Sequence, residues 1–475
     1  MLYLFKTAWI YAEKERWKIV LLYFLHSLSF AGVLFQPYSF GKAINLLQVN
    51  GIGNIRPTLF WLSMYLVGFL AFQVFHHTAR YFELTVAYTM QKNFVDDMYG
   101  RVYSLPIQWH TNNHSGELVN RINTASFSLR DYGFMQHEML GNLLLSVGPV
   151  FILINYSWKY SMICIGLTLV NLVVVTKMNL LIQPILHSIN EETHAYTAKL
   201  FDFIVNIRTV INLHLKEETN EVLNHKFNHY VHERMREFKI NQPRCFISAS
   251  GTFITELVLI LFFLWSASEA GGVIIIGSLI AIVNYFKTMS TSFFDITNTF
   301  YDTMDWKTSL QSVSQIVTTS DELTAKSVSV EVESWEHIAN RNLHFSYDNQ
   351  ESTLRNINLD LRTGSKVAII GSSGSGKSTL IHLLAGFHTP SNGDLIIDGI
   401  KINDFHCINQ MSLLAPQDIE IFENTIRYNI TFGMDYDEKY MEKILVISRF
   451  SEVLKGFPKG LDTDIREKGV NLSGG

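Results

Sequence analysis

Residues 371–378 read GSSGSGKS, which fits the pattern G-x-x-x-x-G-K-[ST] in full. The preceding run KVAII (366–370) predicts a short strand, and KSTLIHLLAGF (377–387) predicts a helix that opens directly after the glycines. A turn of this kind aims backbone N–H groups and a helix N-terminus at one point, which favours an anion. The context predicts a phosphate-binding loop; the alternative is a Gly-Ser-rich loop with a chance lysine.

The residue types in this loop suit a nucleoside triphosphate with Mg²⁺. Gly371, Gly374 and Gly376 allow the backbone to wrap with its N–H groups inward. Lys377 is long enough to reach the β- and γ-phosphates, and the Ser378 hydroxyl suits Mg²⁺. The predicted contacts of the loop are Gly371, Ser372, Ser373, Gly374, Ser375, Gly376, Lys377, Ser378 and Thr379.

The rest of the chain is unusually apolar. Of its 475 residues, 48% are hydrophobic and 17% charged, against about a quarter charged in a typical soluble domain. A net charge of −5 gives no reason to expect nucleic acid. Three widely spaced cysteines form no paired framework, so a reducing compartment is the simpler interpretation. Six apolar runs occupy residues 19–35, 58–75, 139–156, 161–182, 246–267 and 272–286.

These runs predict six membrane spans, because about 20 apolar residues are needed to cross a bilayer. The gaps after the second and fourth runs are about sixty residues long, charged and helically periodic, so we expect helices that project beyond the bilayer. Six spans place both ends of the region on one side. Lys6, Lys14, Arg16 and Lys18 weakly favour the cytoplasm for that side. The protein is thus expected to be a multi-pass integral membrane protein.

The composition changes near Thr318. We predict a membrane domain over 1–317, a polar linker over 318–335 and an ATP-binding domain over 336–475. The second domain is expected to be α/β, because short strand patterns alternate with helical ones. The predicted strands cover residues 342–347, 357–361, 366–370 and 394–399.

Four features occur in the same order as in the nucleotide-binding domain of ATP-binding-cassette (ABC) transporters. They are Tyr347, the phosphate loop, LLAPQDIEIFENTIRYNI (413–430) and LSGG (472–475). Together with the six spans, they resemble an exporter-type half-transporter over nearly the whole chain. The resemblance implies an α-helical six-span membrane domain followed by a P-loop α/β nucleotide-binding domain.

The resemblance also implies individual roles. Tyr347 matches the aromatic residue that stacks on adenine, and Gln417 matches the glutamine that contacts Mg²⁺ and the attacking water. Ser473, Gly474 and Gly475 match the signature that closes over the γ-phosphate bound by a second chain. The alternative for Tyr347 is an ordinary strand aromatic, and the alternative for Gln417 is a solvated loop glutamine. One loop and one signature per chain imply a dimer, either of two copies or of one copy with a homologous half-transporter.

The family continues after LSGG with an Asp-Glu pair that ends a strand and then a histidine. These groups lie beyond the printed sequence, which we therefore expect to be a truncated form of a longer product. Arg466, in REKG, stands where the family usually has glycine.

Two stretches in the long gaps resemble the family's coupling helices, namely 114–122 and 199–210; solvated helical loops are the alternative. Glu256 and Lys287 lie in the fifth and sixth runs, about 14 and 16 residues from the intervening turn. We expect the two residues to lie at similar depth and either to pair or to line the translocation cavity together. The alternative is that Lys287 snorkels to the inner interface and Glu256 is neutral.

At the inner end of the second run stand four polar residues, His76, His77, Arg80 and Glu83. We expect them to be interfacial rather than ligands.

The function predicted from these features is ATP-driven export of an amphipathic lipid, drug or hydrophobic peptide by alternating access. The membrane is expected to be the bacterial cytoplasmic membrane, with the nucleotide-binding domain in the cytoplasm. The alternative is a regulator or channel that binds ATP without turnover.

Overall fold

The computed structural model describes residues 2–113, 115–269, 274–326, 334–347, 353–402, 405–415 and 421–465. The chain divides into two compact units. One comprises Met1–Leu105 and His110–Thr324, and the other Pro106–Trp109 and Ala325–Gly475. Each unit is considered by itself below.

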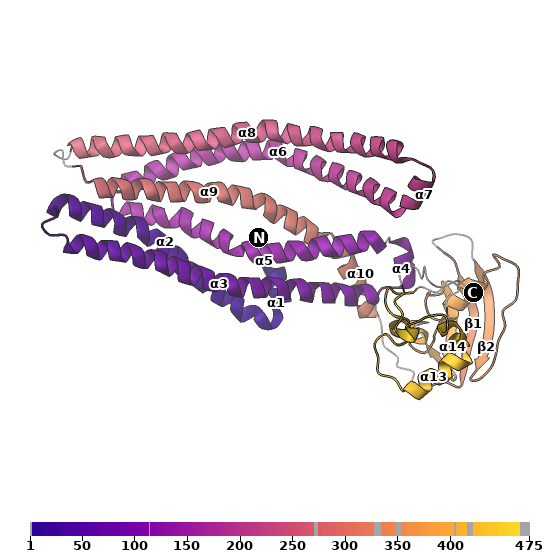
Figure 1. The fold of residues 1–475 in the computed structure, drawn as a ribbon. Coiled ribbons are helices and arrows are strands. Elements are labelled where there is room, and N and C mark those ends of the chain that lie inside the picture. Colours follow the sequence, from indigo (N-terminus) through magenta and orange to yellow (C-terminus); the bar gives the residue numbers. More distant parts are fainter. Residues whose placement is uncertain are drawn as a thin grey trace. The chain divides into compact units, whose positions relative to one another are not determined.

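The first unit is built from long helices (Figure 1). Shorter helices join them. In chain order the helices are α1 (Leu2–Ala12), η1 (Glu13–Glu15), α2 (Arg16–Asn50), α3 (Arg56–Tyr103), α4 (Ile107–Asn112), α5 (Ser115–Ile154), α6 (Trp158–Val205), α7 (Ile207–Asn212), α8 (Lys216–Glu269), α9 (Ile276–Gln311) and α10 (Ser314–Lys326). Of these, α4 and α10 each include residues of the second unit. Local signals mark several ends. Pro57 lies in the first turn of α3, where its missing N–H costs nothing, and α2 ends at Gly51 with φ +60°. Residues 318–326 of the predicted linker lie in α10.

The helices are much longer than a bilayer is thick. α3 has 48 residues, about 72 Å at 1.5 Å per residue, whereas the hydrocarbon core is about 30 Å. The charged segments that follow the apolar runs therefore continue the same helices, as predicted.

Within the described residues, five stretches are long and apolar enough to cross a membrane. They are Leu2–Asn50, Arg56–Tyr103, Leu118–Ile154, Trp158–Val205 and Lys216–Glu269. The sixth predicted run, 272–286, begins at residues outside the described ranges and continues into α9. The count of six spans stays a prediction.

Close packing at glycines joins α2 to its neighbours. A Cβ atom on Gly32 would lie 2.8 Å from the carbonyl oxygen of Gly68 in α3. One on Gly277 would lie 2.0 Å from the carbonyl oxygen of Gly41, so α9 and α2 touch backbone to backbone there. Small residues at such crossings allow the close approach on which helix association in membranes depends.

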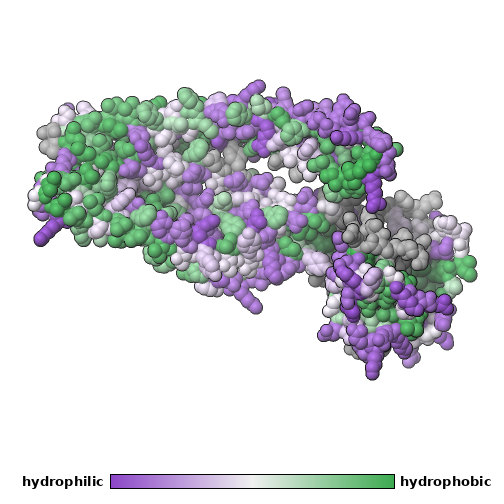
Figure 2. Space-filling model, in the orientation of Figure 1, coloured by the Kyte–Doolittle hydropathy of each residue, from purple (hydrophilic) through white to green (hydrophobic). Residues whose placement is uncertain are grey.

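The surface of the helical unit changes along its length. Figure 2 shows hydrophobic side chains over the half that carries the α2–α3 connection, and more hydrophilic ones over the rest, with a further hydrophobic patch at α7. The exposed apolar side chains of the unit include Phe24, Phe60, Phe69 and Trp265. Such continuous exposed apolar area is typical of a lipid-facing surface.

Two short helices, α4 and α7, lie between long ones, near the predicted coupling stretches. The first elbow is formed by α4, whereas most of 114–122 already belongs to α5. The second elbow is formed by α7, and 199–210 straddles the end of α6 and the start of α7. The coupling role of both stretches stays a prediction.

The second unit contains a small sheet. Its elements are β1 (His337–Phe345), β2 (Leu354–Arg362), α11 (Lys377–Leu384), β3 (Asn392–Ile397), β4 (Ile400–Ile402), η2 (Phe405–Gln410), α12 (Ile426–Thr431), α13 (Glu438–Ile447), α14 (Phe450–Leu454) and η3 (Gly460–Asp462). The strand order is β2-β1-β3-β4, and every described pairing is antiparallel. Ile338 is registered with Leu361 on one side and Ile397 on the other. Leu383 of α11 joins the same core, which fixes the helix against the sheet.

The predicted strand 366–370 is not a strand in the structure. Both edges of β1 are occupied by β2 and β3, and no strand in the described ranges pairs with residues 366–370. A strand exists only when its N–H and C=O groups have a ladder partner. Without one, the apolar side chains stay open to solvent: Ile370 is 93% exposed. The other three predicted strands overlap β1, β2 and β3.

Candidate functional site

The glycine-rich loop forms a tight turn directly before α11. Gly374 has φ +78° and Gly376 φ +87°, and Gly376 caps the helix in the left-handed conformation. Residues with a Cβ atom rarely adopt these angles. A Cβ on Gly376 would also lie 3.0 Å from Leu354 of β2. The loop conformation therefore depends on glycine at both positions.

Lys377 folds back over this loop. Its Nζ donates to the carbonyl oxygens of Gly371, at 3.0 Å, and Ser372, at 2.7 Å. The ammonium group thus lies above the loop, beside the N-terminus of α11. A fixed cation next to a helix N-terminus is an arrangement that attracts an anion.

The first turn of α11 also meets the predicted adenine residue. Thr379 is buried, and its Oγ1 lies 3.3 Å from the Oη of Tyr347. The ring of Tyr347 stands edge-on to Phe345, at 4.8 Å, and to His388, at 5.6 Å. Ser378 is exposed. The structure therefore brings Tyr347, Lys377 and Thr379 together around one helix terminus.

The remaining predicted contacts lie outside the described residues. They are Gln417, Ser473, Gly474 and Gly475. Their roles stay predictions.

The predicted relationship between Glu256 and Lys287 is confirmed as an ion pair. Nζ of Lys287 lies 3.1 Å from Oε1 of Glu256, and the two side chains are 54% and 21% exposed. The pair connects α8 with α9.

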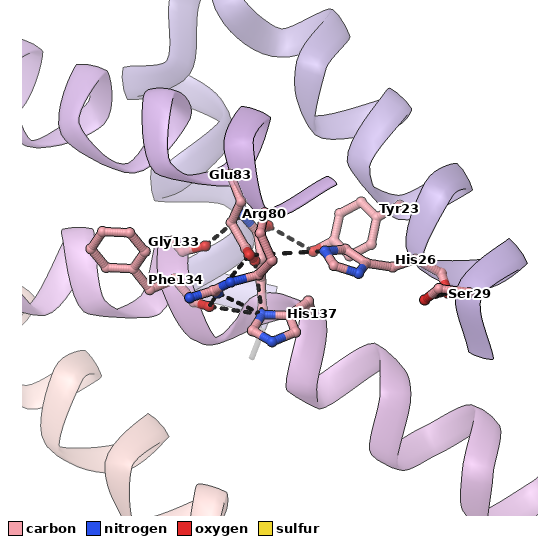
Figure 3. A network of polar contacts seen from close by, with 9 residues as sticks. Tyr23, His26, Ser29, Arg80, Glu83, Gly133, Phe134 and His137 are labelled. Carbon is pink, nitrogen blue, oxygen red and sulfur yellow. Dashed lines mark hydrogen bonds and ion pairs between the residues drawn. The ribbon is translucent and has the colours of Figure 1, made fainter. Parts of the chain in front are cut away.

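A second polar cluster lies within the helical unit (Figure 3). Glu83 of α3 is fully buried; its Oε2 accepts from Nη1 of Arg80 at 2.7 Å, and its Oε1 lies 3.0 Å from Nδ1 of His137 in α5. Arg80 Nη1 also donates to the carbonyl oxygen of Phe134 at 2.9 Å. Glu83 is therefore buried inside the helix bundle, with partners from α3 itself and from α5; its interfacial position stays a prediction.

His26 of α2 completes this cluster and was missed from the sequence. It is fully buried, and its Nε2 lies 3.9 Å from Oε2 of Glu83, too long for a hydrogen bond. Among the described residues neither of its ring nitrogens has a hydrogen-bond partner. Its ring stacks on His137 at 5.0 Å and meets His76 edge-on at 5.4 Å. The available signal was a histidine inside an apolar run, which is more often only a core residue.

Comparisons with known proteins cover both units. Residues 354–475 match the family model described as ABC transporter, and residues 19–293 match that described as ABC transporter transmembrane region. The chain is 39% identical over 140 residues to an ATP-dependent lipid A-core flippase of Photobacterium profundum, covering 28% of this chain and 24% of that protein. It is 24% identical over 500 residues to the protein of that name from Chromobacterium violaceum, covering 99% and 82%.

Among solved structures, a bacterial Atm1-family ABC exporter with ATP bound has a similar fold. Its TM-score is 0.75 at 19% identity, with 97% of this chain and 81% of that chain covered. The matches span less than half the length of several curated relatives.

Proposed function

The chain belongs to the ABC transporter family, and we propose that it exports an amphipathic molecule across a membrane at the expense of ATP, by alternating access as a dimer. It is an integral membrane protein with a helical transmembrane region and an ATP-binding domain. The observation that carries the proposal is the cation of Lys377, held over the glycine loop in a chain whose described residues also include five long apolar stretches.

The loop residues fit a bound MgATP. The left-handed Gly374 and Gly376 keep the cradle free of side chains, and Lys377 supplies a positive charge at its rim. In the proposed complex the loop N–H groups and Lys377 hold the β- and γ-phosphates, Ser378 ligates Mg²⁺, and Tyr347 supports the adenine. The Mg²⁺ ion neutralises charge that develops on the phosphates when the terminal phosphoryl group is transferred.

The second half of each ATP site is proposed to come from another chain. Ser473, Gly474 and Gly475 would close over the γ-phosphate held by the partner's loop, and Gln417 would contact Mg²⁺ and the attacking water. Closure of two such sites would draw the helical units together, and hydrolysis would release them. The partner is a second copy or a homologous half-transporter.

The proposed class of transported substrate rests on the aromatic content of the chain and on the names of its relatives. The chain contains 33 phenylalanines, and aromatic surfaces suit lipids, drugs or hydrophobic peptides. Two relatives are named as lipid A-core flippases, which supports a lipid-like substrate. The proposed location is a bacterial cytoplasmic membrane with the ATP-binding domain on the cytoplasmic side.

Reconstitution of the full-length protein into proteoliposomes tests the proposal. ATPase activity is measured while lipids, dyes and hydrophobic peptides are screened for stimulation, and export of the best stimulator is then followed. Lys377→Ala should lower turnover by about 100-fold or more, whereas Lys401→Ala, on exposed β4, should leave it unchanged. ATP binding without turnover or transport would instead favour a nucleotide-sensing regulator.

A further inference from the structure

We propose that His26, Glu83 and His137 form a binding site for a transition-metal dication of the Zn²⁺ class inside the helical unit. One ligand atom from each residue can be chosen so that all three lie within 4.8 Å of one another. The residues come from α2, α3 and α5, and all three are buried. A bound ion would therefore tie three helices together.

The donor set is one that zinc uses. Two imidazole nitrogens and a carboxylate oxygen are typical Zn²⁺ ligands, whereas Ca²⁺ and Mg²⁺ prefer oxygen donors throughout. Zinc–ligand distances of about 2.0–2.2 Å require ligand atoms a little over 3 Å apart. His137 and Glu83 lie slightly closer than this, at 3.0 Å, and would separate a little around an ion, whereas His26 would approach Oε2 of Glu83 from 3.9 Å.

His26 decides between a metal site and an ordinary ion-pair network. Arg80 and His137 satisfy both oxygens of Glu83, so the network explains the buried carboxylate without a metal. It leaves His26 unexplained, because neither of its ring nitrogens has a hydrogen-bond partner in the described ranges and the side chain is fully buried. Buried polar groups in native structures almost always have a partner. A metal ion between His26 and Glu83 would supply it.

The surrounding groups are compatible with an added ion. Arg80 donates to Oε2 of Glu83, the oxygen nearest His26, and its Nη1 also lies 3.2 Å from Nδ1 of His137. Arg80 is 39% exposed and also bonds the carbonyl oxygen of Phe134, so in the proposed site its guanidinium leaves Oε2 to the ion and keeps the carbonyl contact. His76 offers a fourth ligand. Its Nδ1 is buried without a partner among the described residues, and its ring lies 5.4 Å from that of His26.

The test must exclude a simpler metal binder on the surface. His225 and His229 lie one helical turn apart on exposed α8, with ring centroids 4.8 Å apart. Such a pair takes up divalent metals adventitiously. The reference protein is therefore the chain carrying His225→Gln and His229→Gln, purified without a polyhistidine tag and placed in lipid nanodiscs.

Zinc and cobalt are the probes. After dialysis, elemental analysis of the reference protein should give one Zn²⁺ per chain, and Co²⁺ should show the intense visible bands of a tetrahedral site. His26→Gln should weaken Zn²⁺ binding at least about 10-fold. His77→Gln, which changes an exposed neighbour on α3, should leave the affinity unchanged.

Two results would overturn the site. One is the loss of all stoichiometric metal when His225 and His229 are replaced. The other is Zn²⁺ affinity that is unchanged in a folded His26→Gln variant. If that variant does not fold, the Co²⁺ spectrum of the reference protein decides by itself: tetrahedral bands support the site, and their absence refutes it.

Discussion

Lys287 and Glu256 meet at 3.1 Å, from α9 and α8 respectively. The two residues are 31 positions apart and lie on either side of residues 270–273, which are outside the described ranges. A carboxylate in the middle of an apolar run is costly unless it has a partner. The lysine provides that partner, so the two helices are fixed in register at this depth.

Reversal of one charge should therefore damage the protein, and reversal of both should repair it. Glu256→Lys or Lys287→Glu places two like charges in contact, whereas the double variant restores an opposite pair. We expect a coupling free energy of about 1 kcal/mol, measured from the thermal unfolding of the four proteins in detergent. Lys92→Glu, which breaks an exposed pair with Asp96 on α3, is the control and should have little effect. Strict additivity of the two reversals would show that the contact is not energetically important.

Gly277 should not tolerate even a methyl group. A Cβ there would lie 2.0 Å from the backbone of Gly41, which cannot move as a flexible side chain can. Gly277→Ala should lower stability by about 1–3 kcal/mol, seen as a lower midpoint of thermal unfolding. Gly166→Ala is the matched control, because no atom lies within 4 Å of its Cβ position. Equal midpoints for the two variants would mean that α2 and α9 do not touch as described.

His388 should make the stability of the ATP-binding domain depend on pH. Burial, and then the nearby His382 ring, lower the pKa of His388 below its ordinary value. The unfolded chain then binds more protons than the folded one, so stability falls as the pH drops below about 6.5. His388→Phe should reduce this fall in stability because it removes the titrating imidazole. Phenylalanine can keep the stacking on Phe345, so the packing is preserved.

Hydrogen exchange of β1 and α11 between pH 5 and 7.5, corrected for intrinsic rates, measures the effect. His225→Gln on exposed α8 serves as the control. An identical pH dependence in wild type and His388→Phe would assign the effect to other groups.

Tyr347 should contribute to ATP binding through its aromatic ring rather than through its hydroxyl group. Tyr347→Ala should weaken ATP binding about 3- to 10-fold, corresponding to loss of an aromatic contact of about 0.5–1.5 kcal/mol. Tyr347→Phe loses only the 3.3 Å contact with Thr379 and should bind almost normally. Calorimetric titration with ATP measures both, and Tyr440→Ala on exposed α13 controls for a general loss of aromatic surface. Unchanged affinity in Tyr347→Ala would rule out the proposed adenine contact.

Features that depend on residues close together in the sequence could be predicted from the sequence alone. The phosphate loop, α11 and three of four strands follow from local spacing, as does the matched depth of Glu256 and Lys287. Residues 366–370 fit a strand just as well, but a strand also needs a partner, and local pattern carries no information about pairing.

The same reasoning explains the cluster that was missed. His26, Glu83 and His137 are separated by more than fifty residues each, and each taken singly resembles a core or interfacial residue. Only the packing of α2, α3 and α5 brings them together. The ends of α4 and α7 could not be predicted for a related reason, since periodicity marks a helix but not the residue at which it ends.

Cross-linking between copies tests the central claim most directly. Ser373→Cys in the phosphate loop and Ser473→Cys in the signature are placed on separate chains, in a background where Cys164, Cys245 and Cys407 are replaced by alanine. With both chains reconstituted together, MgATP should produce a covalent dimer under mild oxidation, and each chain alone should produce none. If ATP binds and is hydrolysed while the two cysteines never join in any nucleotide state, the shared ATP site is wrong.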